Sequence, residues 1–165
     1  MRWLTAVLLV LACAWAQAQD VQPVPALSAR VVDQTGTLDA AQRQALEDEL
    51  AAYEQASGPQ IAVLLVKTTA PEDIAAYAQR VADAWKIGRR EVGDGVLIVV
   101  AKNDRKMRIE VAKALEGAVP DLAARQIIDA ALRPAFQAGD YAGGLKAAIA
   151  RLQSRIAGEG LPAPD

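Results

Sequence analysis

The stretch "GDGVLIVVAKNDRKMRIEV", Gly93 to Val111, contains the clearest fold signal in the sequence. Its apolar run from Val96 to Ala101 is continuous and rich in branched residues, which is typical of a strand buried on both faces. Polar residues 103–105 predict a turn, and the segment after them alternates apolar with charged side chains. The stretch therefore predicts a β-hairpin with one buried strand and one strand that has a solvent-exposed face.

Two further strands are predicted upstream of the hairpin. The run "IAVLLV", residues 61–66, is too short for a typical helix and reads as a buried central strand. Val31 and Val32 predict a short strand that ends at Asp33. Together these segments predict a mostly buried mixed sheet of about four strands.

Helices are expected between the strands. The first begins at Thr37 or Asp39 and ends at Gly58, which is followed by a proline. The second begins in the capping-box pattern formed by Thr69 and Glu72, with a proline inside its first turn. Strands that alternate with helices indicate the α/β class.

The last third of the chain is predicted to be helical, with a kink or break at Pro134 and a final helix capped by Asp140. The expected architecture is one three-layer α/β/α domain over residues 30–157. A flexible leader, residues 19–29, precedes it, and a frayed tail, residues 158–165, follows it.

Residues 1–18 have the features of a secretory signal peptide. Arg2 precedes an apolar run, and a small-x-small tripeptide ends at Ala18, where we expect cleavage. The apolar run is shorter than the roughly 20 residues that span a bilayer. We therefore expect a periplasmic protein with no transmembrane helix in the mature chain. Lipid attachment at Cys13 is the minor alternative.

The composition excludes most catalytic chemistries. The sequence has no histidine, and its one cysteine, Cys13, lies in the predicted leader. Disulfides, thiol nucleophiles, Ser-His-Asp triads and the usual zinc sites are therefore excluded from the mature chain. The remaining ligands are oxygen atoms, which suit calcium or magnesium.

The charge pattern does not indicate a nucleic-acid partner. Cleavage removes Arg2 and leaves 17 of the 18 basic residues against 20 acidic ones, a net charge near −3. The densest basic run, Lys102 to Arg108, falls in the predicted hairpin. The pattern favours a solvated turn there over a phosphate-binding patch.

Several motifs in order resemble the TPM-domain family of bacterial envelope and thylakoid-lumen proteins, over roughly residues 31–157. They are "VVDQTGTL", Trp85 with Ile87-Gly88, "GVL" from Gly95, Asp104-Arg105 with "RIEV", "LEG" with Pro120-Asp121, Pro134 with Phe136, and Gly139-Asp140-Tyr141. The resemblance implies an α/β/α domain outside the cytoplasm with an acidic cluster that holds divalent cations, often calcium. It also implies acid phosphatase activity, which is described for a plant relative.

One local departure from the family pattern follows the predicted hairpin. Members usually have Gly-Tyr-Gly before Leu-Glu-Gly, whereas this sequence has Ala112, Lys113 and Ala114. Alanine adopts positive φ only at a cost, so a more regular strand exit is expected. Lys113 is expected to compete with a metal ion for the neighbouring carboxylates.

Asp33, Asp94, Glu116 and Asp121 are the candidate metal ligands, because each is predicted at the end of a strand or the start of a helix. Each also has a structural interpretation: Asp33 and Asp94 suit turns, Asp121 suits a helix N-cap, and Glu116 suits solvent. Arg108 is the candidate for orienting Glu116 or contacting a phosphate, with a cross-strand ion pair as the alternative.

Two functions remain open at this stage. The first is an exported accessory or interaction domain of the cell envelope that binds a divalent cation, with calcium favoured over magnesium. The second is a metal-dependent acid phosphatase, in which the carboxylates serve as ligands. We expect a monomer with an unidentified envelope or membrane-protein partner, and neither the catalytic residues nor a substrate follow from the sequence.

Overall fold

The computed structural model describes residues 20–164. The predicted signal peptide and the alternative lipid attachment at Cys13 lie outside the described residues. Within residues 20–164, none of the helices has the length and apolar character needed to cross a bilayer.

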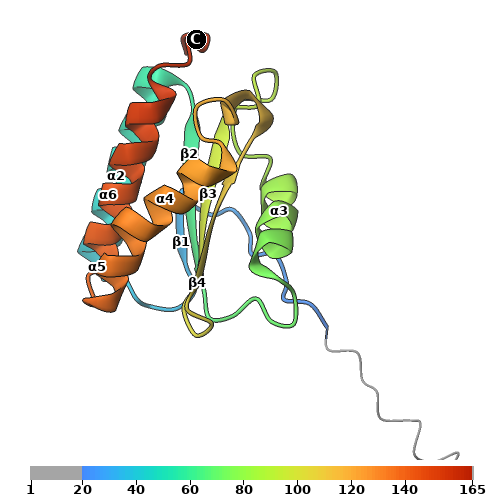
Figure 1. Cartoon of the computed structure of the whole chain (residues 1–165), viewed down its shortest axis with the longest axis vertical. Helices are drawn as coiled ribbons and strands as arrows, with labels where there is room; N and C mark the ends of the chain where they lie inside the picture. The colour runs from blue at the N-terminus through green and yellow to red at the C-terminus, as the bar shows by residue number, and fades with distance from the viewer. Residues whose placement is uncertain (1–19, 165) are drawn as a thin grey trace, which may run out of the picture.

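A four-stranded mixed sheet forms the centre of the domain (Figure 1). Its strands are β1 (Val31–Asp33), β2 (Gln60–Val66), β3 (Gly95–Ala101) and β4 (Lys106–Val111), and they lie in the order β1-β2-β3-β4. β1 runs parallel to β2 and β2 runs parallel to β3, whereas β3 and β4 form an antiparallel hairpin. The predicted strands and the predicted hairpin are confirmed.

The register of the strands divides the core into two layers. Val63 of β2 pairs with Val31 and Ile98, and Ile98 pairs in turn with Ile109. Because successive side chains point to opposite faces, these residues lie together in the larger core layer. The alternate positions, such as Leu64 and Val99, fill the smaller layer on the other face.

Helices cover both faces of the sheet (Figure 1). α3 contributes its buried side chains to the smaller layer, and α2, α4 and α6 contribute theirs to the larger one. The expected three-layer α/β/α architecture is thus confirmed. The helical elements are α2 (Ala40–Ser57), α3 (Ile74–Trp85), η1 (Lys113–Leu115), α4 (Asp121–Ile127), η2 (Ile128–Leu132), α5 (Arg133–Gln137) and α6 (Tyr141–Ile156).

Three predicted helix ends are confirmed. Asp39 caps α2 through a capping box with Gln42, and Gly58 ends the same helix with φ 97°. Asp140 caps α6 by accepting a hydrogen bond from the backbone N–H of Gly143.

The start of α3 was predicted too early. The Thr69 hydroxyl donates to the backbone carbonyl of Glu72, and the Thr69 backbone N–H donates to Asp104 of the hairpin. These contacts close residues 69–72 into a turn. The helix therefore begins after Asp73, whose carboxylate accepts from the backbone N–H of Ala75.

The predicted break at Pro134 takes the form of a wider helical turn. The chain continues from α4 through the π-helical segment η2 into α5, and Pro134 lies in the first turn of α5. Proline lacks an N–H and crowds the preceding turn of an α-helix, so the change in helical winding occurs directly before it.

Residues 20–29, for which a flexible leader is predicted, lie against α3. The Trp85 indole N–H donates to the carbonyl of Pro25 at 2.7 Å, and the Arg80 guanidinium donates to the carbonyl of Gln22 at 2.7 Å. Val24 packs against the smaller core layer. The segment therefore covers part of the α3 side of the domain.

Candidate functional site

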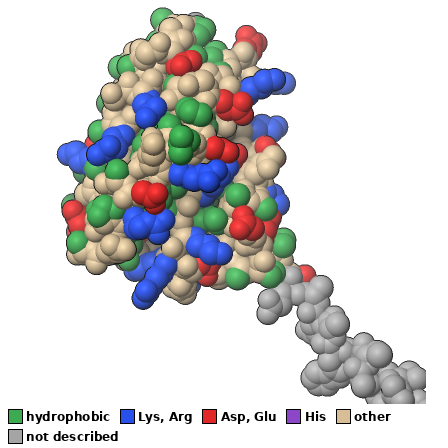
Figure 2. All heavy atoms as spheres, viewed as in Figure 1, with side chains coloured by type: hydrophobic (Ala, Val, Ile, Leu, Met, Phe, Trp, Pro, Cys, Tyr) green, Lys and Arg blue, Asp and Glu red, His purple; other side chains and the backbone are tan. Residues whose placement is uncertain are grey.

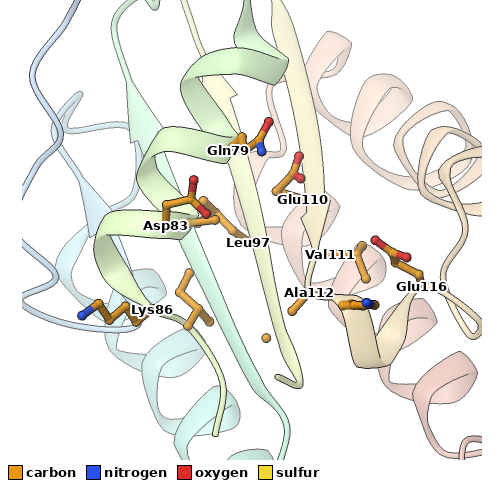
Figure 3. A pocket seen from close by; sticks show the side chains of 12 residues that line it. Gln79, Asp83, Lys86, Leu97, Glu110, Val111, Ala112 and Glu116 are labelled. Carbon is orange, nitrogen blue, oxygen red and sulfur yellow. The ribbon is translucent and has the colours of Figure 1, made fainter. Parts of the chain in front are cut away.

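A cleft between α3 and the end of β4 is lined by three carboxylates and two lysines; we call it the α3–β4 cleft (Figure 3). Its volume is about 430 Å³. The cleft lies on the α3 face of the sheet, at the end where β3 begins and β4 finishes. Its lining residues are Gln79, Ala82, Asp83, Lys86, Ile87, Gly95, Leu97, Glu110, Val111, Ala112, Lys113 and Glu116.

The sheet and α3 place the carboxylates on different walls of the cleft. Glu110 pairs with Leu97 in the β3–β4 register, so its side chain points to the α3 face. Gln79 and Asp83 are four residues apart and project from the same side of α3. In Figure 3 Gln79 and Glu110 face one another across the cleft, whereas Glu116 lies on the far side of β4.

The strand exit positions Glu116. After β4 the chain forms the single 3-10 turn η1, in which Leu115 is buried and Ala114 donates its backbone N–H to Gly93. None of residues 112–116 has positive φ. Ala112 and Ala114 are therefore compatible with this backbone, which is the regular strand exit that the sequence predicts. Lys113 and Glu116 both line the cleft.

The cleft has a mixed charge and a slight acidic excess. Asp83, Glu110 and Glu116 are balanced in part by Lys86 and Lys113. The labelled carboxylates are spread along the cleft (Figure 3), and no three potential ligand side chains within residues 20–164 are grouped closely enough to hold one metal ion. One or two carboxylates with bound water are the ligands that this arrangement offers to a cation.

Arg108 forms ion pairs with two carboxylates at the edge of the sheet. Its Nε lies 3.1 Å from Glu110, and its Nη2 lies 3.8 Å from Asp121. Arg108 and Glu110 are two residues apart in β4, so this ion pair lies along one strand. The predicted alternative, an ion pair across two strands, is wrong. Arg108 thereby holds Glu110 at the mouth of the cleft.

Asp121 occupies the first position of α4, and Pro120 is the N-cap residue. The predicted capping role of Asp121 is therefore wrong by one position, because proline already supplies the extended backbone that the cap requires. The Asp121 side chain is 73% exposed. Its negative charge at the start of a helix is favourable to the helix dipole.

Asp94 is a buried structural carboxylate. Its side chain is 0% exposed and accepts three hydrogen bonds from Arg89, one from the backbone N–H and two from the guanidinium. It precedes β3 at the same end of the sheet as Glu116, but it does not line the cleft. The hydrogen bonds from Arg89 already occupy both of its oxygens.

Asp33 lies at the opposite end of the sheet, where the parallel strands finish. Its carboxylate accepts hydrogen bonds from the backbone N–H groups of Thr35 and Leu38 and from the Thr35 hydroxyl, at 2.6–2.8 Å. Burial alone would raise the pKa of Asp33, but these hydrogen bonds outweigh it and lower the pKa. The structure thus brings Glu116 and Asp94 to one end of the sheet and Asp33 to the other.

Asp33→Asn is expected to lower the free energy of unfolding by about 1–2 kcal/mol at pH 7, because the amide cannot accept all three hydrogen bonds. A carboxyl group whose pKa is lowered by folding stabilises the protein above its unfolded pKa and loses this effect as the pH falls through the folded pKa. Urea unfolding from pH 7 to about pH 2 should therefore show the difference between wild type and variant narrowing below about pH 4.

Asp48→Asn, an exposed change on α2, is the control for that experiment and should stay close to wild type at every pH. A stability difference for Asp33→Asn that is the same at pH 7 and at the acid end would contradict the assigned role.

The α3 side of the cleft was not predicted from the sequence. The sequence pattern of this helix predicts only its buried face, which contains Ile74, Tyr77 and Val81. It does not single out the polar residues Asp83 and Gln79. The available signal was their spacing of four residues, which places two polar side chains on one side of the helix next to its buried face.

Comparison with known proteins assigns the chain to a family. The sequence matches the TPM domain over residues 31–155. The solution NMR structure of the N-terminal domain of a protein from P. gingivalis is similar, with a TM-score of 0.71 and 27% identity over 78% of this chain and 82% of that one. The NMR structure of the BA42 protein from Bizionia argentinensis has a TM-score of 0.66 and 25% identity over 78% and 86% of the two chains.

A third solution structure, the N-terminal domain of a Corynebacterium glutamicum protein, shares the fold. Its TM-score is 0.62, with 15% identity over 87% of this chain and 88% of that one. No curated protein sequence matches. Because the TPM domain match covers most of the chain and all four strands, the chain belongs to the TPM-domain family.

Proposed function

We propose that this TPM domain is an exported accessory domain of the cell envelope that contacts partner proteins and binds a divalent cation weakly in the α3–β4 cleft. The observation that supports weak cation binding is that Asp83, Glu110 and Glu116, which come from three separate elements, all line this one cleft. Carboxylates that share a cleft repel one another, and a bound cation relieves that repulsion.

Calcium is favoured over magnesium because the carboxylates lie on elements that differ in direction. Calcium accepts irregular coordination with several waters, whereas magnesium requires a near-ideal octahedron. Glu116 is the main ligand in this proposal, since Glu110 is already paired with Arg108. Lys113 lies in the same cleft and lowers the affinity by competing for the carboxylates.

A binding role is favoured over catalysis by the chemistry of the cleft. Its side chains include no hydroxyl or thiol nucleophile and no imidazole. The cleft therefore offers ligands and charge rather than a complete set of catalytic groups.

Thermal melting with calcium tests the proposal. If the dissociation constant is about 1 mM, calcium at about 10 mM should stabilise the native state by about 1.4 kcal/mol, which raises the melting midpoint by roughly 3–5 °C. Glu116→Gln should lose most of this shift, and Asp48→Asn should keep it. Lys113→Gln should increase the shift, whereas Lys146→Gln, a matched change on α6, should leave it unchanged.

An unchanged midpoint in calcium for both wild type and Lys113→Gln would contradict cation binding. Equal calcium shifts in wild type and Glu116→Gln would instead place the cation elsewhere.

A metal-dependent phosphatase is the second candidate. The observation that favours it is the pair of lysines, Lys86 and Lys113, in the same cleft as the carboxylates, since ammonium groups can hold phosphoryl oxygens. Turnover of an aryl phosphate that requires a divalent cation and is abolished in folded Glu116→Gln would favour this function. If the aryl phosphate is hydrolysed no faster than in buffer, the phosphatase candidate is contradicted and only the binding role is left.

A further inference from the structure

A second cavity lies on the other face and at the other end of the sheet; we call it the hairpin groove. Its volume is about 700 Å³, and it separates the β3–β4 hairpin from α5 and the start of α6. Lysine and arginine side chains gather at this end of the molecule, around the hairpin (Figure 2). The lining residues are Val100, Ala101, Lys102, Asn103, Arg105, Lys106, Met107, Arg133, Phe136, Gln137 and Tyr141.

The centre of the hairpin groove is apolar. Phe136 and Tyr141 lie with their ring centroids 4.7 Å apart, and Met107 packs with them against the larger core layer. All three side chains are only partly buried. The groove therefore keeps aromatic and thioether surface accessible, and these are side-chain types that are enriched at the centres of protein interfaces.

The rim of the hairpin groove is basic. Lys102, Arg105 and Lys106 come from the hairpin, and none of them takes part in an ion pair among residues 20–164. Arg133 on α5 pairs with Asp129, but both side chains are more than half exposed, so this pair is weak. The rim is left with an excess of positive charge.

The carboxylate within the hairpin does not neutralise that charge. Asp104 accepts hydrogen bonds from the Thr68 hydroxyl and from the backbone N–H of Thr69, at 2.8–2.9 Å. It is thereby held toward the loop that follows β2. The Lys102 ammonium instead lies 5.2 Å from the centre of the Tyr141 ring, which joins the basic rim to the aromatic centre.

We propose that the hairpin groove binds an acidic peptide segment of a partner protein. One apolar side chain of the segment contacts Met107, Phe136 and Tyr141, and flanking Asp or Glu side chains contact the basic rim. A free phosphate would leave the apolar centre uncovered, and a purely apolar ligand would leave the cations without partners. A long nucleic acid is disfavoured by the net negative charge of the protein.

This inference deepens the proposed partner-binding role and is independent of cation binding in the α3–β4 cleft. The two sites lie on opposite faces of the sheet and share no lining residue. Failure of calcium binding would leave the hairpin groove unaffected, and failure of peptide binding would leave the calcium titration unaffected.

The test uses the full mature chain and a short labelled peptide of glutamates around one central phenylalanine, with binding followed by fluorescence anisotropy at low and physiological salt. Binding should weaken with salt. The double variant Arg105→Glu/Lys106→Glu should weaken binding at least about tenfold. The double variant Lys146→Glu/Arg151→Glu, with the same change of charge on α6, should weaken it less than about twofold, and thermal melting should show both variants folded.

Three results would overturn the proposal. The first is the absence of binding at low salt. The second is evidence for a small-anion site, seen either as equal binding of a peptide with serine in place of phenylalanine or as competition by inorganic phosphate at the same concentration as the peptide. The third is equal loss of binding in the two double variants, which means attraction by net charge alone.

Discussion

Gly95→Ala is expected to destabilise the domain by about 3 kcal/mol or more, although it adds only one methyl group. A Cβ atom at Gly95 would lie 2.2 Å from the carbonyl oxygen of Ile87 and 2.5 Å from its carbonyl carbon. Both contacts are with backbone, so no side-chain rotation can relieve them. β3 pairs with strands on both sides and cannot shift away.

Urea unfolding followed by circular dichroism measures this effect. Gly117→Ala is the control, because the nearest atom to its Cβ is 3.4 Å away in the flexible carboxylate of Glu159. The control should stay within about 0.5 kcal/mol of wild type. Similar losses in the two variants would show that the approach of Ile87 to β3 is not the constraint at Gly95.

Asp94→Ala is expected to destabilise the domain by about 2–4 kcal/mol. The substitution removes a fully buried carboxylate and leaves the Arg89 backbone N–H and guanidinium without their acceptor. The estimate lies below that for a completely buried pair, because the Arg89 side chain is 26% exposed and recovers some hydration. The loop before β3 should loosen as a result.

Asp121→Ala is the matched control for Asp94→Ala. Its carboxylate is largely exposed and lies 3.8 Å from Arg108, so its removal should cost less than about 1 kcal/mol. Both variants are compared by urea unfolding at pH 7. A loss at Asp94 no larger than that at Asp121 would contradict a structural role for the buried carboxylate.

The strands were predictable because burial leaves a direct pattern in the sequence. The apolar run of β3 and the alternation in β4 each correspond to the faces that the strands present, and the hairpin between them follows from chain connectivity. The start of α3 was less predictable. Its position depends on Asp104, which is distant in sequence and accepts a hydrogen bond from the backbone N–H of Thr69.

The grouping of the candidate ligands was less predictable than the fold. Asp33 is the last residue of a strand and Asp94 precedes one, and in a parallel sheet these positions lie at opposite ends. The direction of each strand is therefore needed before two end residues can be placed together. The structural role of Asp94 depends on its hydrogen bonds with Arg89. Both residues lie in a loop, where no periodic pattern of the sequence indicates which side chains pair.

The departure from the family motif was informative because its effect is local. Ala112 and Ala114 fit the backbone that the chain adopts after β4, and Lys113 enters the same cleft as Glu116. The sequence alone predicted that Lys113 lies near the neighbouring carboxylate Glu116. The partners on α3, Asp83 and Gln79, required the packing of α3 against β4.

The most direct test of cation binding is a calcium titration of the isotopically labelled domain, followed through its backbone amide resonances. The proposal predicts saturable shifts at millimolar calcium for Glu110, Glu116 and Asp83, weaker shifts with magnesium, and little change near Asp33. Shifts that are absent, that do not saturate, or that are confined to the Asp33 end of the sheet would contradict a cation site in the α3–β4 cleft.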